Sequence, residues 1–260
     1  MCLLILLRDV VPNWPLVVAA NREERFDRPT ERPTLLNRTP SVFGGKDLRA
    51  GGTWLAVNQW GMLCAVTNRP RQEAPADRVR SRGLLCLDAS RQKSPIAVAD
   101  LMGRAVQEQA YDGFNLVCAT TAVAKVFYYD GALREKQLGH AVTVLSTGEA
   151  NDRSLDKVRC VYERLEGFAA EALTAWIERL EAVCRSHCAG PDGRGACCEH
   201  LGEAGTVSSS ILAFHDRDPR KNMFRHAPGP PCQTTYETLE WPYNFFETQM
   251  PPPSAFEPME

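Results

Sequence analysis

Short apolar runs separated by turn residues dominate the first part of the chain. The runs at 2–7 and 16–20 are rich in Leu and Val and flank a Pro-Asn-Trp-Pro segment, which predicts two buried strands joined by a turn. Residues 21–38 are charged and proline-rich, so we expect a loop there. Two Gly-Gly pairs, at 44–45 and 51–52, bracket a turn-rich segment. TWLAVN and MLCAVTN then surround Gln59, Trp60 and Gly61, as in a hairpin.

Helical periodicity begins in the middle of the chain. Ser94 and Pro95, a capping side chain and a first-turn proline, precede the helical pattern IAVADLMGRAVQEQ. A second helix is expected to open near Ser154. A third has its apolar residues on one face: Leu173, Trp176, Ile177, Leu180 and Cys184. Strand patterns occur at 114–120, 125–130, 142–147 and 206–214.

This order of elements indicates the fold class. Strands follow one another at hairpin spacing and not in βαβ units, which favours an α+β fold of stacked antiparallel sheets covered by helices over a doubly wound parallel sheet. We expect one domain over residues 1–260. The proline-rich tail at 228–260, with PPP at 251–253, is expected to be loosely ordered.

Composition narrows the range of partners. The formal net charge of -2 leaves no excess positive field for nucleic acid. The apolar run at 2–7 is too short for a membrane span or a signal peptide, so we expect a cytoplasmic protein without a span. Most of the ten cysteines are therefore expected to be reduced thiols in core positions.

The cysteine at position 2 is the leading candidate for chemistry. Removal of Met1 would make Cys2 the first residue, with a thiol nucleophile beside an α-amine that titrates near pH 8 and can accept the thiol proton. The alternative is that Cys2 is only a small apolar residue at the start of a strand.

Five segments then occur in a characteristic order: AANREERFDRP at 19–29, GGKDLRAGGTWLAVNQWGMLCAVTNRP at 44–70, SRGLL at 81–85, YDGFNL at 111–116 and GTVSSSILAF at 205–214. In this order and spacing the chain resembles the NRDE family. The resemblance implies a four-layer αββα sandwich similar to that of the N-terminal-nucleophile hydrolases, which include choloylglycine hydrolases and penicillin acylases. In those enzymes an N-terminal cysteine attacks an amide.

The resemblance also implies a catalytic set. With Cys2, the family's early polar motif falls on Asn21, Arg22 and Glu24, and its hairpin asparagine falls on Asn68. Arg22 can hold a thiolate or a carboxylate, and the Asn68 amide can donate to an oxyanion. The alternatives are that Asn21 ends a strand, that Arg22 and Glu24 form a surface ion pair, and that Asn68 is a turn residue.

The chain departs from the family pattern at two places. Glu23 stands third in the Asn-Arg-Asp-Glu motif, and Thr147 replaces the asparagine of a Leu-Ser-Asn segment. Thr147 can donate one hydrogen bond but cannot replace an amide. The predicted ligand-binding residues are Arg69, Thr147, Cys198, His200 and Ser208, the last in the Gly-Thr-x-Ser-Ser strand.

Two further clusters have open interpretations. The arginines between 69 and 82 form a solvated loop or, if they border the Cys2 pocket, receive an anionic group. Zinc is conceivable among six residues near the end of the third helix, although we take free thiols as the default and predict no metal. These are Cys184, His187, Cys188, Cys197, Cys198 and His200.

Two functions follow from the resemblance. The first is a cofactor-free hydrolase that cleaves an amide of a small amphipathic molecule through a Cys2 acyl-enzyme. The second is non-enzymatic binding and intracellular movement of haem, a lipid or acyl-CoA in the same pocket, with Cys2, Cys198 or His200 in contact with the haem iron. The oligomeric state is not indicated by the sequence.

Overall fold

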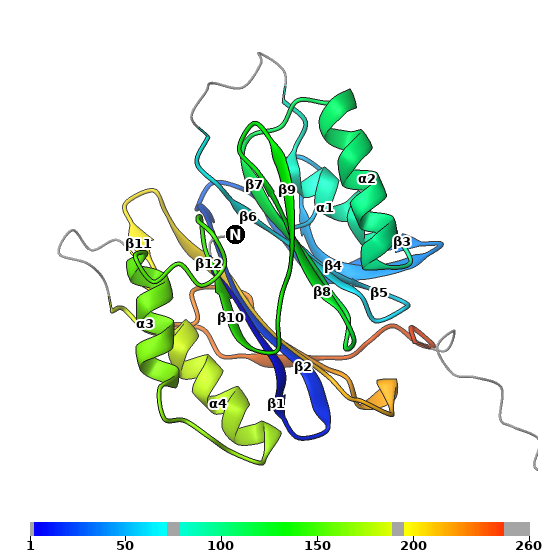
Figure 1. Cartoon of the computed structure of the whole chain (residues 1–260). Coiled ribbons are helices and arrows are strands. Elements are labelled where there is room, and N and C mark those ends of the chain that lie inside the picture. The colour runs from blue at the N-terminus through cyan, green and yellow to red at the C-terminus, as the bar shows by residue number, and fades with distance from the viewer. Residues whose placement is uncertain (1–2, 72–78, 189–194, 247–260) are drawn as a thin grey trace, which may run out of the picture.

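Two antiparallel sheets are stacked face to face, and a pair of helices covers the outer face of each (Figure 1). The computed structural model describes residues 3–71, 79–188 and 195–246. This arrangement is the predicted four-layer αββα sandwich.

The first sheet has seven strands and begins with the N-terminal hairpin. Its strand order is β10 (Ala141–Leu145), β1 (Leu3–Val11), β2 (Trp14–Arg25), β12 (Ala204–Phe214), β13 (Met223–Ala227) and β14 (Glu237–Leu239), with β11 (His200–Leu201) paired to β12. The hairpin β1–β2 is formed by the two apolar runs that predict it. The helices α3 (Asp156–Leu165) and α4 (Leu173–Cys184) cover the outer face of this sheet.

The second sheet also has seven strands, and they lie in chain order. They are β3 (Thr30–Arg38), β4 (Ser41–Asp47), β5 (Leu55–Asn58), β6 (Leu63–Asn68), β7 (Phe114–Ala119), β8 (Ala124–Tyr129) and β9 (Leu133–Gln137). The helices α1 (Arg82–Ser90) and α2 (Pro95–Glu108) cover its outer face. Ser94 caps α2 by accepting a hydrogen bond from the Ala97 N–H, as its position before Pro95 predicts.

Strand alternation separates two apolar cores on either side of the first sheet. On β2, Val18 and Ala20 face the second sheet, whereas Val17 and Ala19 face α3 and α4. All four are buried, and successive strand residues must point to opposite faces. The same alternation determines which polar residues of β2 can reach the cavity between the sheets.

Buried polar side chains connect the two sheets at opposite ends of the sandwich. Arg8 on β1 is 2% exposed and donates to the carbonyls of Leu138, Gly139 and Ala122 beside the second sheet. At the other end, Asn115 on β7 donates to loop carbonyls that follow β10. Each of these side chains donates hydrogen bonds to backbone carbonyls and so links elements of the two sheets.

The expectation of a loop over 21–38 was wrong. Most of this stretch is strand, because β2 runs on to Arg25 and β3 begins at Thr30. The polar end of β2 remains a strand because it pairs with β12, with Arg22 opposite Ser208. β3 is an edge strand and can expose its charged residues to water.

The turn-rich segment expected between the two Gly-Gly pairs is a turn at residues 48–50, and the first pair, at 44–45, belongs to the strand before it. Both residues lie inside β4, where a side chain would collide with neighbours. A Cβ on Gly44 would lie 2.4 Å from the Leu55 carbonyl oxygen, and one on Gly45 would lie 2.3 Å from the Trp54 ring. The glycines therefore allow close approach of Trp54 and β5 to β4, and they do not mark a chain reversal.

The described part of the tail, residues 228–246, is packed and not loose. The strand β14 pairs with β13, and aromatic residues that pack against one another follow it. Trp241 stacks on Phe245, which makes an edge contact with Phe43 of β4.

Two further elements were not predicted from the apolar periodicity. They are the strand β9 and the short helix α1, whose N-cap is Ser81. None of the helices in the described ranges is long and apolar enough to cross a membrane.

A buried histidine in β13 generates a prediction about acid stability. His226 is 2% exposed and lies within 3.0 Å of the Ser210 hydroxyl. Burial lowers the pKa of His226 to about 4, and Arg32 acts in the same direction against Glu237. An unfolded histidine titrates near pH 6.5, so the unfolded state binds more protons between about pH 4 and 6.5.

We therefore expect the free energy of unfolding to fall by about 3 kcal/mol as the pH drops from about 6.5 to 4 through His226 alone. Urea unfolding at a series of pH values measures this slope. His226→Gln, which cannot titrate, should remove that share of the slope. An unchanged slope in the variant would show that another group is responsible.

Candidate active site

A cavity of about 210 Å³ opens between β2 of the first sheet and β4 and β6 of the second, beside the start of α1. Its described lining includes Trp54 and Asn68, and it is rich in charge. The charged residues are four arginines and three acids: Arg22, Arg28, Arg80, Arg82, Glu24, Asp47 and Asp112. The cavity can therefore hold a polar group that carries charge.

Arg22 is the most buried of these charges. Its guanidinium carbon lies 4.3 Å from the centre of the Trp54 ring, and the residue is only 4% exposed. Its Nη2 lies 3.7 Å from a Glu24 oxygen, whereas its buried Nη1 has no hydrogen-bond partner among the described residues. Burial lowers the pKa of Arg22, and Glu24 and Asp47 oppose that shift. A desolvated cation with an unused donor attracts an anionic group.

A second ion pair supports Arg22 at the cavity wall. Arg28 Nη2 lies 2.6 Å from Asp47 Oδ2, and Arg28 Nε lies 3.5 Å from Glu24. Burial would raise the pKa of Asp47, but the hydrogen bonds from Arg28 and from the Arg49 N–H hold it below its usual value. Glu24 thus lies between two arginines and orients Arg22.

Asn21 does not belong to this cavity, although it is next to Arg22 in sequence. Its Nδ2 donates to the carbonyls of Cys184, at 2.9 Å, and Cys197, at 2.7 Å, on the helix side of the first sheet. Glu23 points to the same side and pairs with Lys157. Strand alternation separates these two residues from Arg22 and Glu24, so the predicted contiguous motif is divided between two faces.

Asn68 ends β6, and its exposed side chain lies at the cavity. It is thus brought together with Arg22 and Glu24, as the catalytic prediction requires. Cys2 lies outside the described residues. The nearest described neighbour, Leu3, pairs with Asn21, and Leu4 pairs with Ala20.

Arg69 and Thr147 line a different cavity, of about 510 Å³. Arg69 already donates to Asp130, at 2.9 Å, and to Glu149, at 2.8 Å, so its guanidinium serves internal ion pairs. Arg80 is likewise bonded to Asp88, at 2.6 Å, although it does line the first cavity. Part of the arginine-rich stretch, residues 72–78, lies outside the described residues.

The other predicted ligand-binding residues are dispersed. Ser208 pairs with Arg22 across β2 and β12 and is 8% exposed, but it is not among the lining residues. His200 begins β11 and Cys198 precedes that strand, and both lie near the segment that follows α4. They are separate from the cavity that contains Arg22.

Comparison with known proteins agrees with the fold. A sequence model of the family described as "Transport and Golgi organisation 2" matches residues 1–192. The chain belongs to this family. The mouse Transport and Golgi organization 2 homolog is 31% identical over 141 residues, which is 50% of each chain. The Drosophila melanogaster protein is 32% identical over 127 residues, which is 44% of this chain and 39% of its own length. The chain thus spans about half the length of the curated Transport and Golgi organisation 2 relatives that it matches.

Solved structures place this Transport and Golgi organisation 2 member among N-terminal-nucleophile hydrolase folds. Penicillin V acylase from Agrobacterium tumefaciens superposes with a TM-score of 0.58 at 10% identity, covering 92% of this chain and 86% of that one. The Caenorhabditis elegans ortholog of N-acylethanolamine-hydrolyzing acid amidase gives 0.55 at 11% identity, with 92% and 100% coverage. At such identities the likeness concerns the fold alone.

Three lining residues of this family member escaped the sequence analysis. Trp54 lies in the GGTWL motif, but its role as the platform under Arg22 depends on a contact between the two sheets. Arg28 and Asp47 read as surface charges in loops. Arg28 and Asp47 come together in the cavity wall only because β3 pairs with β4. No pattern of neighbouring residues could have shown this.

The two asparagines of the predicted catalytic set should behave differently in unfolding experiments. Removing the Asn21 amide leaves two buried carbonyls without a donor, at a cost of about 1–3 kcal/mol for each such group. We expect Asn21→Ala to lower the free energy of unfolding by about 3 kcal/mol. The exposed Asn68→Ala should stay within about 0.5 kcal/mol of the parent protein.

Urea denaturation followed by circular dichroism gives both values. Equal stability of Asn21→Ala and the parent would contradict the structural role, and would return Asn21 to the list of candidate catalytic residues.

Proposed function

We propose that the chain is a cysteine N-terminal-nucleophile hydrolase that cleaves an amide bond of a small amphipathic molecule carrying an acidic group. The observation that carries the proposal is the buried Arg22 guanidinium, stacked on Trp54 with an unused Nη1 in the charged cavity. Such a group binds a carboxylate, a thiolate or a developing oxyanion strongly.

The position of the N-terminal strand supports the choice of nucleophile. Leu3, which follows Cys2 in sequence, pairs with Asn21, which precedes Arg22. The first sheet therefore holds the start of β1 beside the part of β2 that lines the cavity. The proposal gives Cys2 the role of nucleophile once Met1 has been removed.

The proposed reaction proceeds in two balanced steps. The α-amine of Cys2 takes the thiol proton, and the thiolate adds to the amide carbonyl. Collapse of the adduct breaks the C–N bond, forms a thioester and releases the protonated amine. Water then attacks the thioester, which releases a carboxylic acid and restores the thiol. No cofactor enters this scheme.

Three cavity residues have assigned roles in this reaction. The Asn68 amide donates to the oxyanion of each tetrahedral adduct, because its side chain is exposed to the cavity on the second sheet. Arg22 binds the acidic group of the substrate or stabilises the Cys2 thiolate. Glu24, held by Arg22 and Arg28, keeps the guanidinium in place.

Binding of haem or an acyl-CoA without turnover is the competing function. A site for a flat apolar ligand is expected to have mainly hydrophobic and aromatic walls. The described walls instead combine four arginines and three acids with Trp54 and Val66. Hydrolysis of an acid-bearing amide therefore agrees better with this lining.

The test measures the hydrolysis of a panel of N-acyl amino acids. Each is compared with the corresponding N-acyl amine, which lacks the carboxylate. We expect the acidic substrates to be hydrolysed faster, and Cys2→Ala to abolish release of the amine. Asn68→Ala should lower kcat by roughly 10²- to 10³-fold, the cost of one lost oxyanion donor. Arg22→Lys keeps the positive charge but removes the planar guanidinium, which can donate two parallel hydrogen bonds to a carboxylate. The variant should therefore show a reduced preference for acidic substrates.

Arg217→Lys, at an exposed arginine outside the cavity lining, is the matched control and should leave all rates unchanged. Intact mass spectrometry shows whether Met1 is removed and whether an acyl adduct forms on Cys2. Retention of Met1, or undiminished turnover by Cys2→Ala, would exclude the mechanism. A shifted Soret band without turnover would favour haem binding.

A further inference from the structure

Four potential metal ligands converge where α4, β11 and the loop after β13 meet. They are His187, Cys198, His200 and Cys232. One ligand atom from each lies within 4.8 Å of all the others. None of the four lines the cavity that contains Arg22, so this cluster is separate from the proposed active site.

Three measured distances approach the edges of a metal-centred tetrahedron. Cys198 Sγ lies 3.5 Å from Cys232 Sγ and 3.8 Å from His200 Nε2, and the last two atoms are 3.2 Å apart. With Zn–S of about 2.3 Å and Zn–N of about 2.0–2.1 Å, tetrahedral angles require separations of roughly 3.3–3.8 Å. The three atoms are thus nearly in place around one ion.

The fourth ligand is oriented by the backbone. His187 Nδ1 lies 2.9 Å from the Cys198 carbonyl oxygen, and because a carbonyl can only accept, Nδ1 must carry the proton. This tautomer leaves the lone pair on Nε2 free to bind a cation. Histidines that bind metals usually donate their other N–H in this way.

Hydrogen bonds outside the cluster hold its three chain segments together. The Cys198 N–H donates to the Ser186 carbonyl at 2.9 Å. Arg185 Nε donates to the Pro231 carbonyl at 3.0 Å, which fixes the residue before Cys232 against the end of α4. These hydrogen bonds therefore hold the segments that carry the four ligand residues close to one another.

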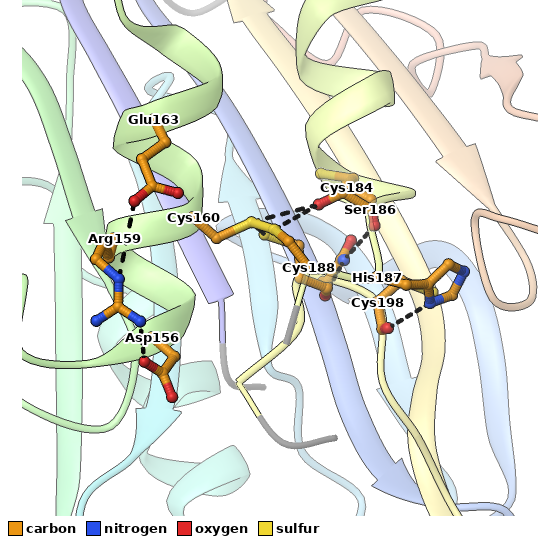
Figure 2. Close-up of a disulfide and its surroundings, with 11 residues drawn as sticks. Asp156, Arg159, Cys160, Glu163, Cys184, Ser186, His187, Cys188 and Cys198 are labelled. Atoms are coloured by element: carbon orange, nitrogen blue, oxygen red, sulfur yellow. Dashed lines mark hydrogen bonds and ion pairs between the residues drawn. A yellow bond between two sulfur atoms is a disulfide. The ribbon is translucent and has the colours of Figure 1, made fainter. Parts of the chain in front are cut away.

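Neighbouring cysteines form a second, distinct group. Cys160 of α3 is bonded to Cys188 by a disulfide (Figure 2). Cys197 Sγ lies 3.6 Å from Cys160 Sγ. The sequence placed Cys188 and Cys184 in the same group of six residues as His200. The fold instead commits Cys188 to Cys160 and brings Cys232, which is distant in sequence, to the histidines.

We propose that His187, Cys198, His200 and Cys232 bind one Zn²⁺ or a similar thiophilic divalent cation in tetrahedral geometry. Two thiolates and two neutral imidazoles are a common zinc ligand set, and they neutralise the ion. All four positions come from the protein, so the site is a structural clamp that joins α4, β11 and the loop after β13. This inference does not depend on the proposed hydrolase activity.

The test uses the untagged full chain, kept reduced and stripped of metal with a chelator, and titrated with Co²⁺. We expect the absorption bands of tetrahedral Co²⁺ with thiolate ligands at one equivalent per chain, and loss of these bands when Zn²⁺ is added. Cys232→Ser and His200→Ala should each weaken Co²⁺ binding by more than roughly 10- to 100-fold. That range is typical when only a hydrogen bond to a metal ligand is lost.

Two variants serve as controls. Cys188→Ser removes a cysteine of the second group, and His140→Ala removes an exposed histidine elsewhere; both should bind Co²⁺ as the parent does. Zn²⁺ should raise the Tm of the parent but not of Cys232→Ser. The Tm of metal-free Cys232→Ser should match that of the metal-free parent, which shows that the variant still folds.

Three results would overturn the proposal. They are the absence of tetrahedral bands in the fully reduced parent, unchanged binding by a Cys232→Ser, His200→Ala double variant, and loss of binding in Cys188→Ser with retention in Cys232→Ser. The last result would move the ion to the group formed by Cys160, Cys188 and Cys197.

Discussion

The face-to-face packing of the two antiparallel sheets is the interaction on which the rest of the structure depends. Its contact surface is apolar along most of its area, with Leu4, Leu6 and Val18 of the first sheet packed against Val57 and Leu63 of the second. Burial of this surface supplies most of the driving force for folding. Burying a charge among apolar side chains is costly. A charged side chain can therefore enter such an interface only at its margin, where it keeps polar surroundings on one side.

Arg22 occupies such a margin. Its position on β2 points it toward the second sheet, and Trp54 supports the flat face of the guanidinium. A buried cation on an indole is stabilised by about 2 kcal/mol or more when it is desolvated. Gly45 makes this possible, because any side chain there would occupy the space of the Trp54 ring. The cavity is thus a consequence of how the sheets meet.

The strand β2 serves two regions of chemistry at once. Its residues Arg22 and Glu24 face the cavity, whereas Asn21 and Glu23 face α3 and α4. The Asn21 amide holds the carbonyl of Cys197, the residue before the metal-cluster ligand Cys198. The same strand therefore stiffens the cavity wall and the frame of the proposed metal site.

The sequence by itself determined the local elements and the fold class. Apolar alternation and turn residues predicted the β1–β2 and β5–β6 hairpins, and Ser94 with Pro95 predicted α2. The resemblance carried by the order of the five motifs implied the αββα sandwich. The hairpins and the helix depend on neighbouring residues, whose periodicity and caps act over a few positions.

Only the tertiary structure decided which residues share a site. It kept Arg22, Glu24 and Asn68 together, moved Asn21 to the opposite face, and brought Cys232 to His200 across 32 residues. The strand at 21–25 looked like a loop because its partners lie far away in sequence. Its backbone pairs with β12, and its polar side chains contact Trp54, α3 and the carbonyls of Cys184 and Cys197. Long-range pairing, and not local propensity, gives such residues their environment.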